Sequence, residues 1–143
     1  MAFVLADTGA DAALNAWLNN SWPASKDFVI KLYTNNYVPL DTSATGDFTE
    51  ATGGGYVTKA LSNGSWTVNV ANDPSDGVYA KQTWTFTGAL TAGATIYGYF
   101  VVNNNGSGTL VGAEKLTTAF TPATNGDTLD ITPQIQMSKG TPT

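Results

Sequence analysis

Residues 96–102, Ile-Tyr-Gly-Tyr-Phe-Val-Val, form the stretch of this chain that says most about its fold. In an extended strand, alternate side chains point to opposite faces, so two tyrosines and a valine fall on one side and three apolar side chains on the other. Such a strand is either covered on both faces or offers one face to a partner. Tyr97 and Tyr99 suit a partner, because each carries a large apolar body and a hydroxyl that can stay wet. Coverage by a helix or loop of the same chain is the alternative.

The same two-residue alternation recurs along most of the sequence and predicts the fold class. Further strands are expected at residues 28–33, 56–61, 66–70, 83–87, 109–116 and 129–137. The apolar phases place Trp66 and Trp84 in the core, and Pro133 indicates a bulge or an edge position in the last segment. Clusters of Gly, Asn, Asp, Pro and Ser separate the segments. The pattern predicts a mainly β protein, an antiparallel β-sandwich or jelly roll of about seven to eight strands.

One short helix is expected near the N-terminus. Residues 8–11, Thr-Gly-Ala-Asp, can cap it, and Leu14, Trp17 and Leu18 follow on one apolar stripe. We expect this stripe to pack on the protein's own core, with docking on a partner as the alternative. A single domain over residues 1–143 is expected, with an arm and helix in 1–23, the sandwich in 24–138 and a polar tail in 139–143.

The composition argues against most catalytic chemistry. The 143 residues include no histidine, cysteine or arginine, and only 12% are charged. The commonest general base, the best unaided nucleophile and the two-point phosphate ligand are therefore all absent. The net charge of −5 and six scattered lysines argue against a nucleic-acid partner, and no apolar run is long enough to span a membrane. The chain is not expected to be an enzyme or to bind a metal or cofactor.

The remaining motifs have structural interpretations. The three glycines at 53–55 suggest a phosphate loop, but they lead into a strand, so a bend built on positive φ is the better interpretation. The acids lie mostly in turns, where Asp caps the backbone. A glycan hydrolase using paired carboxylates, with Glu114 as one candidate, stays open as a third hypothesis. Trp22, between Ser21 and Pro23, is the tryptophan expected to be partly exposed.

Several phrases in a fixed order carry a resemblance over nearly the whole chain. They are the opening Met-Ala-Phe and the short helix, then residues 32–39 (Leu-Tyr-Thr-Asn-Asn-Tyr-Val-Pro), 48–56 (Phe-Thr-Glu-Ala-Thr-Gly-Gly-Gly-Tyr), 85–88 (Thr-Phe-Thr-Gly), 96–102 and 126–129 (Gly-Asp-Thr-Leu). In these the sequence resembles small virion structural proteins of tailed bacteriophages, such as capsid decoration or cement proteins. The resemblance implies a structural protein of the particle with a β-sandwich or jelly-roll core and no catalytic site.

A capsid cement protein is therefore the leading functional hypothesis. It would be made in the host cytoplasm, lie on the outer capsid surface, and bridge major capsid protein subunits together with copies of itself, as a trimer. The expected partner contacts are the helix face or the arm residues Phe3, Val4 and Leu5, the long loop of residues 37–46 with Tyr37, and Tyr97 or Tyr99. Trp22 is a further expected contact. The alternative is a tail or fibre module that binds host-surface glycans through exposed aromatics such as Trp22.

Overall fold

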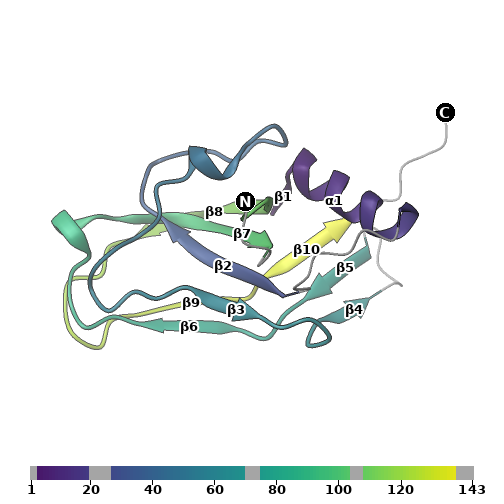
Figure 1. Ribbon diagram of the computed structural model, residues 1–143. Coiled ribbons are helices and arrows are strands. Elements are labelled where there is room, and N and C mark those ends of the chain that lie inside the picture. The colour runs from purple at the N-terminus through teal and green to yellow at the C-terminus, as the bar shows by residue number, and fades with distance from the viewer. Residues whose placement is uncertain (1–2, 20–26, 70–74, 104–107, 138–143) are drawn as a thin grey trace.

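A computed structural model describes residues 3–19, 27–69, 75–103 and 108–137. It confirms a mainly β, antiparallel sandwich with one α-helix near the N-terminus (Figure 1). The described elements are β1 (Val4–Leu5), α1 (Asp7–Leu18), β2 (Phe28–Tyr33), the 3₁₀ turn η1 (Thr45–Asp47), β3 (Lys59–Leu61), β4 (Thr67–Asn69), β5 (Ser75–Val78), β6 (Gln82–Thr85), the 3₁₀ turn η2 (Thr91–Gly93), β7 (Ile96–Asn103), β8 (Leu110–Phe120), β9 (Thr128–Ile131) and β10 (Gln134–Met137).

The first layer is a five-stranded sheet in the order β1-β8-β7-β2-β3. All of its neighbouring strands are antiparallel. β7, which carries the stretch at 96–102, lies in the middle and pairs with β2 and β8 on its two sides. This central position explains why both of its faces are apolar, because each face is covered by another layer of the same chain.

The second layer contains a three-stranded sheet, β10-β5-β4, and a two-stranded sheet, β6-β9. The two sheets are formed by the same pair of chain segments, because β5 continues into β6 along one segment and β9 continues into β10 along the other. Gln82 pairs with Ile131 and Val78 with Gln134, so residues 79–81 lie opposite only residues 132–133. This extra residue is a bulge, and the Tyr79 N–H bonds the Pro133 carbonyl across it at 2.9 Å. The predicted interruption at Pro133 is confirmed.

Ten strands are described, more than the sequence pattern predicts. One reason is that Pro133 divides the last predicted strand into β9 and β10. Another is β5, which lies partly in a segment expected to be a turn. Its residues are Ser-Asp-Gly-Val, a weak strand sequence. Pairing with β4 on one side and β10 on the other makes it a strand nevertheless.

The core between the two layers, here called the inner core, is built from the apolar phases of the strands. Trp84 and Phe86 are buried in it, and the placement of Trp84 is confirmed. Trp66 is only half-buried and packs at the margin, edge-on to Phe28 and Tyr79. Val68, on the same phase of β4, is 66% exposed, so the expected apolar face of this strand is wrong. β4 pairs with β5 alone and lies at the edge of its sheet, where a side chain has little to pack against.

A second core, here called the outer core, covers the opposite face of the five-stranded sheet. Its buried members are Ala6, Tyr33, Phe48, Phe100, Val102, Leu110 and Ala113. It is covered by α1 and by residues 34–50, which include η1. These two segments together are called the cap. Figure 1 shows the cap above the sheet and strands β4, β5, β6 and β9 below it.

The two tyrosines of β7 lie in different cores, contrary to the expected alternation. Ile96 pairs with Phe120 and Gly98 with Lys115, so residues 116–119 of β8 lie opposite Tyr97 alone. This irregularity changes the phase of β7. Tyr97 is half-buried against the outer core, whereas Tyr99 is buried in the inner core.

Candidate interaction surface

Helix α1 is anchored to β8 by its small residues. Ala6, Gly9 and Ala16 are buried, and a side chain at Gly9 would collide with the backbone of Val111. The Ala6 N–H bonds the Val111 carbonyl at 3.0 Å, and the Thr8 hydroxyl donates to the Leu110 carbonyl at 2.9 Å. The helix backbone therefore lies closer to the sheet than large side chains would allow.

The expected apolar stripe of this helix does not face the core. Leu14 is 51% exposed and Leu18 is 78% exposed, so the expectation that they pack on the protein's own core is wrong. The side chain of Trp17, the third member, lies outside the described part of the chain. The physical reason is the competing stripe of small residues, because only that stripe permits the close approach at Gly9.

The helix also begins earlier than the sequence indicates. It starts at Asp7 with Ala6 as its N-cap, and no side chain caps it. The expected cap at residues 8–11 is wrong, because the Thr8 hydroxyl is bound to β8. The Asp7 N–H instead donates to the Asp41 carbonyl at 2.9 Å, so residues 34–50 satisfy part of the helix terminus.

Residues 34–50 are held down by one aromatic side chain, Phe48. Its ring is stacked on Phe100 at 5.1 Å between centroids and lies 5.1 Å from Tyr33 and 5.3 Å from Tyr37. The Tyr37 hydroxyl lies 3.0 Å from the Ser43 hydroxyl, which folds the loop back on itself. With the large rings turned inward, two smaller apolar residues stay on the surface: Val38 is 47% exposed and Leu40 is 54% exposed.

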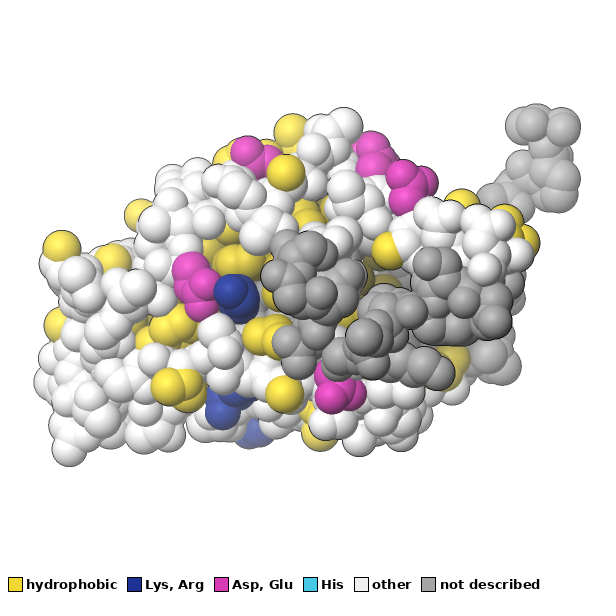
Figure 2. All heavy atoms as spheres, in the orientation of Figure 1, with side chains coloured by type: hydrophobic (Ala, Val, Ile, Leu, Met, Phe, Trp, Pro, Cys, Tyr) yellow, Lys and Arg dark blue, Asp and Glu magenta, His cyan; other side chains and the backbone are white. Residues whose placement is uncertain are grey.

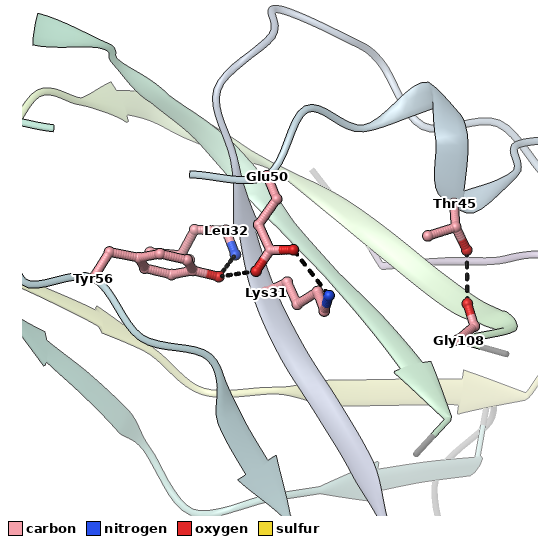
Figure 3. Close-up of polar contacts among 6 residues, drawn as sticks. All are labelled: Lys31, Leu32, Thr45, Glu50, Tyr56 and Gly108. Carbon is pink, nitrogen blue, oxygen red and sulfur yellow. Dashed lines mark hydrogen bonds and ion pairs between the residues drawn. The ribbon is translucent and has the colours of Figure 1, made fainter. Parts of the chain in front are cut away.

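Polar contacts fasten the margins of the cap (Figure 3). The Thr45 hydroxyl donates to the Gly108 carbonyl at 2.9 Å. At the edge of β2, the Lys31 ammonium pairs with Glu50 at 2.9 Å, and the Tyr56 hydroxyl donates to the other Glu50 oxygen at 3.3 Å. Tyr56 also accepts the Leu32 N–H at 3.1 Å. This backbone donor, at the point where β3 no longer borders β2, is thereby satisfied.

The outward face of the cap is acidic and partly apolar. Asp7 and Asp11 of α1 and Asp41 and Asp47 of the loop are all exposed. Figure 2 shows acidic side chains along the upper margin of the molecule, over α1 and the loop; the lysines lie lower down, where other acidic side chains also occur. The exposed Leu14, Leu18, Val38 and Leu40 belong to the same two segments. In the cap, exposed apolar and negatively charged groups therefore occur together.

The other predicted contact residues are less accessible. Phe3, Val4 and Leu5 are half-buried; Val4 and Leu5 pair with β8 as strand β1, and the Phe3 ring lies 6.2 Å from that of Tyr99. Tyr99 is 2% exposed, so its assignment as a partner contact is wrong: the inner core already covers it.

Of the remaining predicted contacts, two are half-exposed and one is not described. Tyr37 and Tyr97 are half-buried against the outer core and keep part of their surface free. Trp22 lies outside the described residues. The structure therefore brings Tyr37 into the cap, places Tyr97 in the sheet below it, and leaves the arm at the edge of that sheet.

The groups with catalytic potential have structural partners. The Tyr99 hydroxyl donates to the Glu114 carboxylate at 2.7 Å; burial, this hydrogen bond and the carboxylate charge raise the pKa of Tyr99 well above its ordinary value. The pKa of Tyr33 is raised by burial and by Glu114, and that of Tyr56 by burial and by Glu50. Within the described segments, no three acidic, histidine or cysteine side chains are grouped so that they could hold a metal ion.

The glycines at 53–55 form the predicted bend. All three have positive φ, between 56° and 80°, and the Gly54 carbonyl accepts the Thr87 N–H at 2.9 Å. At Gly54, a side chain would meet the carbonyl oxygens of Gly88 and Ala89. The bend therefore fastens this segment against residues 87–91, and the phosphate interpretation has no support here.

No helix among the described residues is long and apolar enough to cross a membrane. Comparison with protein-family models and with curated proteins finds no match for this chain.

Proposed function

We propose that this protein is a structural component of a tailed-bacteriophage virion, a capsid cement protein that bridges major capsid protein subunits on the outer shell. Its first support is the order of sequence phrases in which this chain resembles small virion proteins of tailed bacteriophages. The observation that carries it in the structure is the cap, which presents Leu14 and Leu18 to solvent on a helix firmly fixed to the sheet. A rigid block with an exposed apolar surface is suited to act by contact.

The composition fits a role in assembly. Only 12% of the residues are charged, and charged groups are those depleted from the centres of protein interfaces. Many copies, each with a modest contact area, would stabilise a shell through avidity. Self-association as a trimer belongs to this proposal.

A deletion experiment tests the role. Phage particles lacking this protein are expected to lose DNA on heating at a lower temperature than complete particles, and purified protein added back is expected to restore the difference. Mass spectrometry of separated heads and tails should find the chain in heads, and sedimentation should find a trimer. Equal heat stability with and without the protein would overturn the cement role. Finding it only in tails would favour the glycan-binding fibre module.

A further inference from the structure

The exposed side of α1 has two halves of different chemistry. Asp7, Asp11, Leu14 and Leu18 follow one another at spacings of four, three and four residues, so they lie along one side of the helix. All four are exposed. The stripe is acidic at its beginning and apolar at its end.

Leu14 and Leu18 differ from Val57 and Val68, the large exposed apolar residues that the described segments carry outside the cap. Val57 and Val68 are exposed on separate segments, and single exposed apolar residues are common in soluble proteins. Leu14 and Leu18 are instead neighbours on one helix, which gives them a joint surface. That surface does not hold the fold together, because the small residues on the opposite side of α1 make the contact with β8.

Charge argues against a second copy of this chain as the occupant. The four lysines in the described segments already have partners within the molecule. Lys31 pairs with Glu50 and Lys81 with Asp130; Lys59 lies over the Trp84 ring and Lys115 bonds Asn36. Helix α1 has no basic residue in its last turn, so two such helices packed against each other would bury carboxylates without cations.

From this we infer that the exposed stripe of α1 docks on another protein whose surface carries lysine or arginine beside an apolar pocket. Leu14 and Leu18 enter the pocket, and Asp7 and Asp11 face the cations. Resting on the proposed function, this inference assigns α1 as the side of the cement protein that faces the major capsid protein. A contact of this kind combines apolar burial with charge steering, so its strength depends on salt.

The test measures binding of the purified protein to phage heads that lack it, by co-sedimentation. The main variant is Leu14→Gln with Leu18→Gln, since glutamine keeps the helix propensity but not the apolar surface. Burial of two leucines is worth several times the 1.4 kcal/mol that changes affinity tenfold, so we expect binding to weaken more than about tenfold. Val57→Thr with Val68→Thr is the matched control and should bind as wild type.

A charge variant tests the electrostatic part of the proposed contact independently of the leucines. Asp11→Asn is expected to weaken binding by roughly 2- to 5-fold at low salt, with the difference disappearing at high salt. Urea unfolding of all variants should match wild type, because the altered side chains are exposed.

The outcomes separate this inference from the function on which it rests. If wild type does not bind heads, the cement role fails. If wild type binds and the leucine variant binds equally well, the docking assignment is overturned and the cement role stands. Loss of self-association in the leucine variant, with head binding unchanged, would assign the stripe to a second copy and also overturn the inference.

Discussion

The two faces of the five-stranded sheet are covered by different means. The inner face meets a second β-layer across a core that includes Ile30, Leu32, Trp84 and Phe86. The outer face meets a short helix and a loop, fixed by Gly9 and Phe48 and fastened by hydrogen bonds at their margins. The inner cover buries Trp84, Phe86 and Ile131 and exposes Val68 only at its edge strand β4, whereas the cap leaves leucines and carboxylates in solvent. We conclude that the inner core provides most of the stability and that the cap is available for contact.

Matched Phe→Ala substitutions in the two cores test whether the inner core contributes more stability than the cap. Phe86→Ala removes a fully buried ring of the inner core, which packs beside Phe120. We expect it to lower the free energy of unfolding by about 4 kcal/mol, since core Phe→Ala changes cost 3–5 kcal/mol. Phe48→Ala removes the ring that holds the loop and should cost about 3 kcal/mol. Urea denaturation measures both.

Hydrogen exchange distinguishes where each loss is felt. In Phe48→Ala the cap should open locally, so the Thr34 and Ala51 amides, which bond Thr49 and Leu32, should exchange faster. Amides of β7 should keep most of their protection. In Phe86→Ala protection should fall throughout the sandwich. Equal loss in β7 and in the cap of the Phe48 variant would contradict the proposed division into two regions.

Two glycine substitutions compare the same two regions, with smaller expected changes in the free energy of unfolding. A side chain at Gly98 would collide with the Glu114 carbonyl and the Tyr33 ring, whereas a side chain at Gly46, in the cap, meets nothing within 4 Å. Gly98→Ala forces the sheet and the outer core apart and should cost about 3 kcal/mol. Gly46→Ala should leave the free energy of unfolding unchanged or raise it by up to about 1 kcal/mol. A neutral Gly98→Ala in urea denaturation would mean that the sheet and outer core are loosely packed.

Much of the fold could be predicted because alternation is a local signal. The segments around Leu32, Trp84 and Val101 are predicted as strands from their own sequence. In the structure they are β2, β6 and β7, and all three side chains are buried. β5 was not predictable in this way, because Gly77 becomes a strand residue only through its pairing with Val68 and Ile135. The different cores of Tyr97 and Tyr99 depend likewise on a register shift against β8 that no local pattern records.

The candidate surface was predicted only in part, and the missing signal lay in small residues. The sequence contains two helical stripes, one of large apolar residues and one that includes Ala6, Gly9, Ala13 and Ala16. Ordinary amphipathic reasoning chooses the large one for the core. The choice is reversed here because Gly9 fits against the Val111 backbone, and a glycine on the small stripe could have indicated this close approach.

The smallest expected effect concerns the hydrogen bond between Tyr99 of β7 and Glu114 of β8. The buried Tyr99 hydroxyl donates to Glu114 of β8, so it is neutral in the folded protein and its pKa is raised. A raised pKa means that the folded state holds its proton more tightly than the unfolded state does. The resulting stability is fully present below about pH 10, the ordinary tyrosine pKa, and is lost as the pH rises further. The pKa values of Tyr33 and Tyr56 are raised as well, so the free energy of unfolding should fall steeply as the pH rises above about 10.

Tyr99→Phe isolates one of these contributions. At neutral pH the variant should be less stable than wild type by about 1 kcal/mol, because Glu114 loses a hydrogen-bond donor. Above about pH 10 the difference should shrink by up to about 1.4 kcal/mol per pH unit, since phenylalanine has no proton to lose. Urea unfolding across the alkaline range measures this change, with Tyr56→Phe as the parallel variant on the other carboxylate, Glu50. A constant difference between Tyr99→Phe and wild type at every pH would show that the Tyr99 hydroxyl ionises in the folded protein as readily as in the unfolded chain. The hydrogen bond to Glu114 would then not hold the Tyr99 proton more tightly in the folded state than in the unfolded state.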